Sequence, residues 1–275
     1  MIEKRQYNIA FAILTSLFLI FSVYWAVLNV TGNTGDKVFG STYGLVALVG
    51  GICGLIAARS WGFFKSYFGK AIIFLSFGLL LAEFGQLAFT YLSIVDEAIP
   101  YPSIADIGFF GAIPMYIAGA YYLMRGLGAG AIVAKRPLKL AIGIIVPLCI
   151  LALSYAVFLD GYDPTGLSAL TVFLDFGYPL GQAIYVSIAL VLLLSLGRML
   201  GGVMRGPVLL LLIAFIVQYA ADFNFLYQTH NGTWQNGKYG DYLYLVAYFV
   251  MGLSLIFLNR ALAKAFAKRE PTEGS

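Results

Sequence analysis

The sequence predicts an all-α integral membrane protein with eight transmembrane helices, and three observations support this fold class. The chain has 275 residues, of which 61% are hydrophobic and only 11% are charged, unlike the composition of water-soluble domains. Apolar runs close to the ~20 residues that cross a bilayer recur along the chain. These runs are continuous and do not alternate with polar residues, so they indicate helices and not the strands of a membrane β-barrel.

The first apolar run follows Lys4 and Arg5, as in a signal peptide. It is nevertheless about as long as a full span and lacks a small-residue cleavage site, so we expect it to be a helix. The predicted spans cover residues 8–30, 40–58, 71–94, 104–125, 138–159, 172–197, 206–228 and 241–262.

Positive charge is distributed unevenly between the two sides of the predicted membrane. Of the 17 Lys and Arg residues, all but Lys37 and Lys238 lie in the termini or in the loops on the same side as the termini. Because positive loops are retained in the cytoplasm, both termini are expected inside the cell, with the protein in the inner (plasma) membrane. The net charge of +4 is explained by this topology, and nucleic acid is not expected as a partner.

The two halves of the chain resemble each other at a nearly constant offset. Phe39-Gly40 matches Phe176-Gly177, and residues 85–91 match residues 221–227. Asp106 matches Asp241, so the three offsets are 137, 136 and 135 residues. This similarity predicts two tandem, parallel four-helix repeats, 1–130 and 131–262, followed by a basic cytoplasmic tail, 263–275.

Several cofactor and enzyme classes lack their residues here. The single histidine, His230, falls in a predicted loop, and Cys53 and Cys149 lie in different spans, where we expect them to pack. No lysine lies in the middle of a span to form a retinal Schiff base, so no cofactor is expected. HExxH, GxSxG and phosphate-binding glycine motifs are also lacking, and enzymatic activity is not the expectation.

Acidic and amide residues lie inside the predicted spans, where each charge costs about 2.5–3.5 kcal/mol on insertion scales. Spacings of three, four or seven residues group them with tyrosines on helix faces, mostly in the half predicted to face outward. If these faces converge, they form an acidic, tyrosine-rich pocket that opens outward. The predicted ligand-binding residues are Glu83, Gln86, Asp106, Asp175, Gln182, Gln218, Asp222, Asp241, Tyr244 and Tyr248.

An alternative is that these groups only hold helices together. Hydrogen bonds between membrane helices contribute about 0.6 kcal/mol on average, so several carboxylates would be inefficient for that purpose. The alternative is strongest for Asp106, because Ser103 precedes it by three residues in a capping-box arrangement. Asp241 also lies at a predicted helix start, where an acid interacts favourably with the helix dipole.

Two motifs resemble a known family. The segment Tyr101-Pro102-Ser103-Ile104-Ala105-Asp106 is similar to the "PSxAD" segment in the multi-helix N-terminal membrane region of bacterial GGDEF/EAL-type signalling proteins. Asp222-Phe223-Asn224-Phe225 with Gly240-Asp241 resembles the second-half pattern of that region. The resemblance implies an input module, here without an output domain, that would signal through a cytoplasmic or membrane partner.

Three function classes stay open at this point. The first is a sensory or ligand-binding module whose outward pocket takes a cationic or hydroxyl-bearing ligand. The second is a small transporter coupled to a cation, a proton or an amine, for which the few polar residues in the inner halves supply no complete path. The third is a structural or assembly subunit. The spacing of Gly50 and Gly54 is typical of close helix contacts and would also suit a homo-oligomer.

Overall fold

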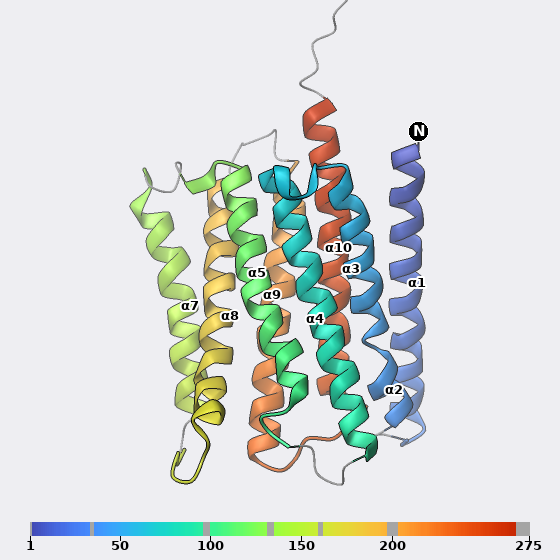
Figure 1. The fold of residues 1–275 in the computed structure, drawn as a ribbon, viewed down its shortest axis with the longest axis vertical. Coiled ribbons are helices and arrows are strands. Elements are labelled where there is room, and N and C mark those ends of the chain that lie inside the picture. Colours follow the sequence, from blue (N-terminus) through green and yellow to red (C-terminus); the bar gives the residue numbers. More distant parts are fainter. Residues whose placement is uncertain are drawn as a thin grey trace, which may run out of the picture.

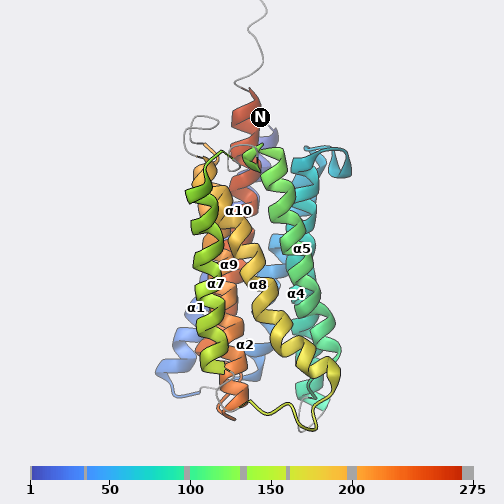
Figure 2. The ribbon, with the colours of Figure 1, turned by 90° about the vertical axis from the view of Figure 1, so that its left-hand side faces the viewer.

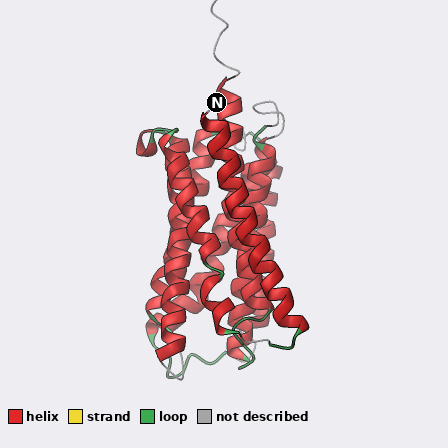
Figure 3. Ribbon diagram, turned by 90° about the vertical axis from the view of Figure 1, so that its right-hand side faces the viewer, coloured by secondary structure: helices red, strands yellow, loops and turns green. Residues whose placement is uncertain are grey.

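The computed structural model is a bundle of long helices (Figure 1) and describes residues 2–33, 36–95, 100–130, 135–158, 162–196 and 203–267. These residues form helices and no strand (Figure 3). Within them, eight segments are long and apolar enough to cross a membrane, which confirms the predicted number of spans. The helices are α1 (Ile2–Val30), α2 (Lys37–Thr42), α3 (Leu45–Arg59), α4 (Tyr67–Val95), α5 (Ile104–Gly126), α7 (Pro137–Phe158), α8 (Ala169–Leu196), α9 (Arg205–His230) and α10 (Tyr239–Ala267), with a 3₁₀ turn, η1 (Phe63–Lys65), after α3.

The second span is not the continuous helix that the sequence predicted. It consists of α2 and α3, separated by a turn at Tyr43 and Gly44. Asp36 starts α2 by accepting a hydrogen bond from the Phe39 N–H at 2.7 Å. A Cβ at Gly44 would lie only 2.0 Å from a carboxyl oxygen of Glu83 on α4, so any larger residue here would displace the Glu83 side chain. Hydropathy could not reveal the break, because the segment from Lys37 to Arg59 as a whole is apolar enough to be one span.

The other end of the chain also differs from the prediction. α10 continues to Ala267, so the segment expected as a tail over 263–275 begins as a helix. Residues 268–275 lie outside the described part of the chain.

Six helices form a closed ring. α3 packs against α4, α4 against α5, α5 against α8, α8 against α9, α9 against α10, and α10 against α3. α1 packs on α10 and α3, and α7 packs on α8, both from outside the ring (Figures 1 and 2). Only 17% of the apolar stretch of α1 and 22% of that of α7 are buried, compared with 61% for α10. These two helices therefore present most of their apolar surface outward, where a multi-pass protein meets lipid.

Glycines let the ring helices approach closely. Gly50 on α3 faces Gly252 on α10, where an added Cβ would lie 3.1 Å from the Gly252 Cα. Gly54, one turn further, packs on the Ser76 side chain of α4. The α3 face that carries Gly50 and Gly54 is thus covered by helices of the same chain. It gives no support to the expected homo-oligomer.

The expectation for the cysteines is wrong for one of them. Cys53 on α3 is partly buried, whereas Cys149 lies exposed on α7. Because α7 packs on the ring from outside, one face of this helix points away from the ring even at mid-span. Hydropathy alone does not distinguish such a face from a packed one.

The N-terminal end of α1 and the C-terminal end of α10 lie at the same end of the bundle (Figure 1). Basic side chains at this end lie over tyrosine rings. The Arg260 guanidinium is 4.8 Å from the Tyr7 ring centroid, and the Lys70 ammonium is 5.2 Å from that of Tyr122. Tyrosine–cation pairs of this kind are typical of a membrane–water boundary.

A close backbone contact between α4 and α5 gives a stability prediction. Gly108 of α5 rests on the backbone of α4, where a Cβ would lie 2.3 Å from the Gly85 nitrogen and 2.5 Å from the Leu81 carbonyl oxygen. We expect Gly108→Ala to destabilise the protein by at least about 1–3 kcal/mol, because backbone atoms cannot move aside. Denaturant or thermal unfolding in detergent measures this loss.

Gly111→Ala on the same helix is the matched control. Its Cβ would meet only the Leu81 side chain at 3.6 Å, an ordinary contact. Because alanine favours a helix over glycine by about 0.5–1 kcal/mol, this variant should be neutral or slightly more stable. Equal stability of the two variants would contradict the close α4–α5 packing.

Candidate functional site

A pocket lies at the end of the bundle opposite the termini, the end predicted to face outward. The C-terminal parts of α4 and α9, the starts of α5, α8 and α10, and the α2–α3 turn converge there. The residues that line the pocket are Tyr43, Gln86, Phe89, Tyr101, Asp106, Phe109, Tyr178, Asp222, Phe225, Leu226, Trp234, Asp241 and Tyr244.

The pocket is narrow as it stands. Its outline encloses about 510 Å³ of empty space including the mouth, but the centre of a water molecule can reach only about 40 Å³. This exceeds the roughly 10–15 Å³ that one ordered water needs. The pocket therefore has room for a few waters or a small ligand, and a larger ligand would have to displace side chains.

Asp222 on α9 joins three helices. One of its carboxyl oxygens accepts a hydrogen bond from the Tyr244 hydroxyl on α10 at 2.7 Å. The other accepts from the amide of Gln218 at 3.0 Å and from the amide of Gln182 on α8. All three donors are neutral, so the carboxyl is hydrogen-bonded but has no countercharge among them.

Asp241 and Gln86 line the wall of the pocket near the α2–α3 turn. Asp241 is buried in the first turn of α10, where it accepts a hydrogen bond from the Gly237 N–H at 2.6 Å. Gln86 accepts from the Tyr43 hydroxyl at 2.7 Å and donates to the Gly40 carbonyl at 2.7 Å. α4 and the α2–α3 turn are thereby held together at the base of the pocket.

Asp106 has both a structural role and a place in the pocket. Together with Ser103 it forms the predicted capping box of α5, with the Ser103 N–H 2.8 Å from one carboxyl oxygen. The other oxygen accepts a hydrogen bond from the Tyr178 hydroxyl on α8 at 2.8 Å. The capping alternative is thus correct for one oxygen, while the other belongs to the pocket wall.

Asp175 lies beside the pocket without lining it. Its two carboxyl oxygens accept hydrogen bonds from the Tyr101 and Tyr162 hydroxyls, each at 2.8 Å. Burial, reinforced by the nearby carboxyl, raises the pKa of Tyr162 to about 12 and also raises the pKa of Tyr101. Both phenols therefore keep their protons at neutral pH and act as donors that connect the loops to α8.

Aromatic rings complete the wall. Phe225 packs edge-on against Trp234 with ring centroids 4.8 Å apart, and against Phe89 at 6.1 Å. The Trp234 ring covers Gly240, where an added Cβ would lie 2.4 Å from a ring carbon. The loop before α10 is thereby closed over the start of that helix.

The charge of the pocket is one-sided. Asp106, Asp222 and Asp241 are its charged members, and no lysine, arginine or histidine is among its described lining residues. The described residues also contain no group of three or more His, Cys, Asp or Glu side chains arranged to hold a metal ion. Among the described lining residues, these carboxyls therefore have hydrogen-bond donors but no basic side chain as a partner.

Five of the ten predicted site residues line this pocket: Gln86, Asp106, Asp222, Asp241 and Tyr244. Gln182 and Gln218 contact it through Asp222, and Asp175 through Tyr101. Glu83 and Tyr248 are buried and lie outside its lining.

Sequence reasoning missed several aromatic residues of the pocket, among them Tyr43, Tyr101 and Trp234. Their positions near span ends are also those of an interfacial aromatic belt, so position alone did not single them out. Tyr178 offered a signal, because it shares a helix face with Asp175 and Gln182 at spacings of three and four residues.

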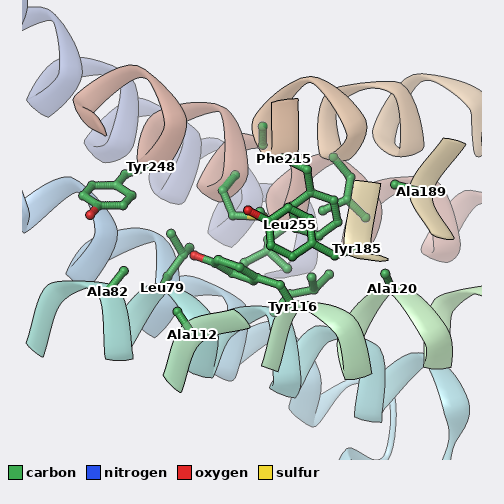
Figure 4. Packing of buried hydrophobic residues seen from close by; sticks show 14 of the residues in the cluster. Leu79, Ala82, Ala112, Tyr116, Ala120, Tyr185, Ala189, Phe215, Tyr248 and Leu255 are labelled. Carbon is green, nitrogen blue, oxygen red and sulfur yellow. The ribbon is translucent and has the colours of Figure 1, made fainter. Parts of the chain in front are cut away.

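The ring is filled with side chains inward of the pocket. Figure 4 shows the rings of Tyr116, Tyr185 and Phe215, from α5, α8 and α9, packed together at the centre. The Tyr185 and Phe215 centroids are 4.4 Å apart, and those of Tyr116 and Phe215 are 5.5 Å apart. Tyr116 is ten residues beyond Asp106, about 15 Å further along the helix. This aromatic cluster closes the bundle below the pocket.

Comparison with known proteins finds no family model, no curated protein and no solved structure that matches the chain.

The three hydrogen bonds to Asp222 give a prediction. Asp222→Leu would leave the Tyr244 hydroxyl and the two glutamine amides facing an apolar side chain, at a cost of about 1–3 kcal/mol for each donor that stays buried. Asp222→Asn keeps an acceptor oxygen for the amides, and Tyr244 can turn its hydroxyl to accept. We expect melting temperatures in detergent to fall in the order wild type, Asp222→Asn, Asp222→Leu. An Asp222→Leu variant as stable as the wild type would show that this network does not hold the helices together.

Proposed function

We propose that this chain is a membrane sensory module that binds a small organic cation, an amine with an apolar part, in the pocket at the outer end of the bundle. The observation that carries the proposal is the convergence of three carboxyl groups and several aromatic rings with no basic side chain in the described lining. A cation would supply the missing countercharge. The rings would contact its apolar part and attract its charge through their faces.

The hydrogen bonds favour a ligand over a purely structural role for these acids. Tyr178 and Tyr244 orient the carboxyls of Asp106 and Asp222 without neutralising them. Such an arrangement holds two acceptors in place before a ligand arrives, which lowers the ordering cost of binding. Adhesion between helices alone would not require ionisable groups, since amide or hydroxyl side chains make comparable bonds.

The closed inner half favours sensing over transport. The Tyr116, Tyr185 and Phe215 rings fill the centre of the ring of helices, and Leu79 and Leu255 pack beside them (Figure 4). Gly50 and Gly252 hold α3 and α10 in close contact at the same level. In this proposal a bound cation alters the packing of α8, α9 and α10 around Asp222, and the change reaches a membrane or cytoplasmic partner at the other end.

Two finer features belong to the same proposal. The order of packing in α3, α4 and α5 corresponds to that in α8, α9 and α10, which supports an origin in two tandem repeats. The basic residues near the termini, with their tyrosine partners, support a cytoplasmic location for that end. The resemblance of the "PSxAD" segment to bacterial signalling proteins agrees with an input role.

Ligand-induced stabilisation tests the binding site. Purified protein is heated with ethylammonium, benzylammonium, choline or tetraethylammonium at equal ionic strength. A ligand that binds the folded state stabilises it by about 2.7 kcal/mol at a hundredfold excess over its Kd. We expect at least one amine to raise the melting temperature of the wild type, and the Asp222→Asn/Asp241→Asn variant to lose this shift.

Asp163→Asn is the control for general charge effects. Asp163 is exposed at the same end, and hydrogen bonds from Thr165 lower the pKa of its carboxyl, so it is charged at neutral pH. This variant should keep the full amine response. If no amine stabilises the wild type, or if all variants respond alike, the pocket is not an amine site. Uptake of the binding amine by liposomes would identify a transporter in place of a sensor.

Cysteine labelling tests the orientation. In a background with Cys53 and Cys149 replaced by serine, Gln235→Cys places a thiol in the exposed loop before α10, and Phe64→Cys places one in η1 at the other end. A membrane-impermeant maleimide should label Gln235→Cys in intact cells, and Phe64→Cys only after permeabilisation. The reverse pattern would place the acidic pocket on the cytoplasmic side and contradict the positive-inside prediction.

A further inference from the structure

Glu83 is a buried acid that the outer pocket does not use. It lies on α4 one turn inward of Gln86, and only 4% of its surface is exposed. Its Oε2 atom has no hydrogen-bond partner. This oxygen fits against Gly44, where any Cβ would come within 2.0 Å of it. The missing side chain at Gly44 thus leaves the space that the carboxyl occupies.

A second polar group without a partner lies nearby. Tyr248 on α10 is 1% exposed, and its hydroxyl makes no hydrogen bond. Its ring stacks on that of Tyr43, with centroids 6.2 Å apart and planes inclined by 15°, and Tyr43 directly precedes Gly44. Tyr248 and Glu83 thus pack against two adjacent residues of the α2–α3 turn, Tyr43 and Gly44. α4 and α10 therefore each place a buried polar atom without a hydrogen-bond partner beside this turn.

Two further oxygens lie at the same turn. Gln86 Oε1 and the Tyr43 hydroxyl are joined by a 2.7 Å hydrogen bond. Gln86 and Glu83 both lie against Gly44. A Cβ added to Gly44 would be 3.2 Å from the Gln86 Cγ and 3.0 Å from the Glu83 carboxyl carbon. Because Tyr43 and Gln86 also line the outer pocket, their hydrogen bond forms the boundary between that pocket and Glu83.

A carboxyl group in such a place needs a positive partner or a proton. Ionised and unpaired inside a membrane protein it would be costly, and an unsatisfied buried hydroxyl adds to that cost. One carboxylate balances one positive charge, and the other nearby atoms that could coordinate a cation are neutral oxygens. Oxygen ligands suit hard metal cations, and a single carboxylate matches a monovalent cation better than a divalent one.

We propose that Glu83 and Tyr248 form an inner binding site for a small alkali-metal cation, separated from the outer pocket by the Tyr43–Gln86 hydrogen bond. Glu83 supplies the charge and Tyr248 a neutral oxygen, while Gln86 and Tyr43 close the site from outside. The two sites use different acids, since Glu83 does not line the outer pocket.

The test compares sodium, potassium and lithium chloride at equal concentrations, with purified protein in a neutral detergent and a metal-free buffer. The three salts screen charges equally, whereas a specific binding site distinguishes the three cations by size. We expect a saturable rise in melting temperature of about 2–4 °C that differs among the ions. Glu83→Gln should abolish the ion-specific part of the rise, whatever its own stability.

Tyr248→Phe keeps the stacked ring and removes only the hydroxyl. It should raise the half-saturating ion concentration several-fold, and it keeps the proposal testable if Glu83→Gln does not fold. Tyr185→Phe is the matched control, because it also removes a buried hydroxyl without a partner, at a site on α8. That variant should respond like the wild type.

The Asp222→Asn/Asp241→Asn variant should keep the alkali-ion response, so failure of the amine site and failure of the inner site are distinguishable. An equal response to all three ions would overturn the inner site, as would a specific response that survives in Glu83→Gln. Stability that rises on acidification in the wild type but not in Glu83→Gln, with no difference among the ions, would also overturn it. Glu83 would then be held as a neutral acid.

Discussion

The hydrogen bonds around Asp222 join α8, α9 and α10 at the wall of the pocket. Gln182, Gln218 and Tyr244 satisfy both carboxyl oxygens from three helices. The same constraint recurs at Asp106 and Asp241, because a polar group inside a membrane must find its partners within the protein. The positions of the ring helices at this end are consequently set by a few polar contacts as well as by apolar packing.

Apolar packing determines the rest of the bundle. Glycines allow α3 to approach α10, and Gly108 allows α5 to touch the backbone of α4. The inner half is filled by large rings, whereas the other half retains a pocket lined by acids and tyrosines. Among the described residues, the centre of the bundle is therefore filled by apolar and aromatic side chains, whereas the end with the pocket is polar.

The fold class followed from the sequence because a span is a local property. Some twenty apolar residues suffice to cross a bilayer whatever their neighbours are, so all eight spans were predicted. The break at Tyr43 and Gly44 was not predicted, since the apolar run through residues 40–58 continues across it. The sequence also could not predict that α10 and α4 cover the face with Gly50 and Gly54, because residue spacing does not reveal which helix packs on a face.

For the site, the sequence by itself determined which acidic and amide residues lie within apolar spans, and helical spacing grouped them on helix faces. Tertiary structure alone decided which faces meet: it brought Asp106, Asp222 and Asp241 together with Tyr43, Tyr178 and Trp234. It left Glu83 and Tyr248 buried outside the pocket lining, each with an oxygen that has no hydrogen-bond partner. The physical reason is that the insertion cost of a carboxyl is a property of one residue. Its hydrogen-bond partners depend on how distant helices pack.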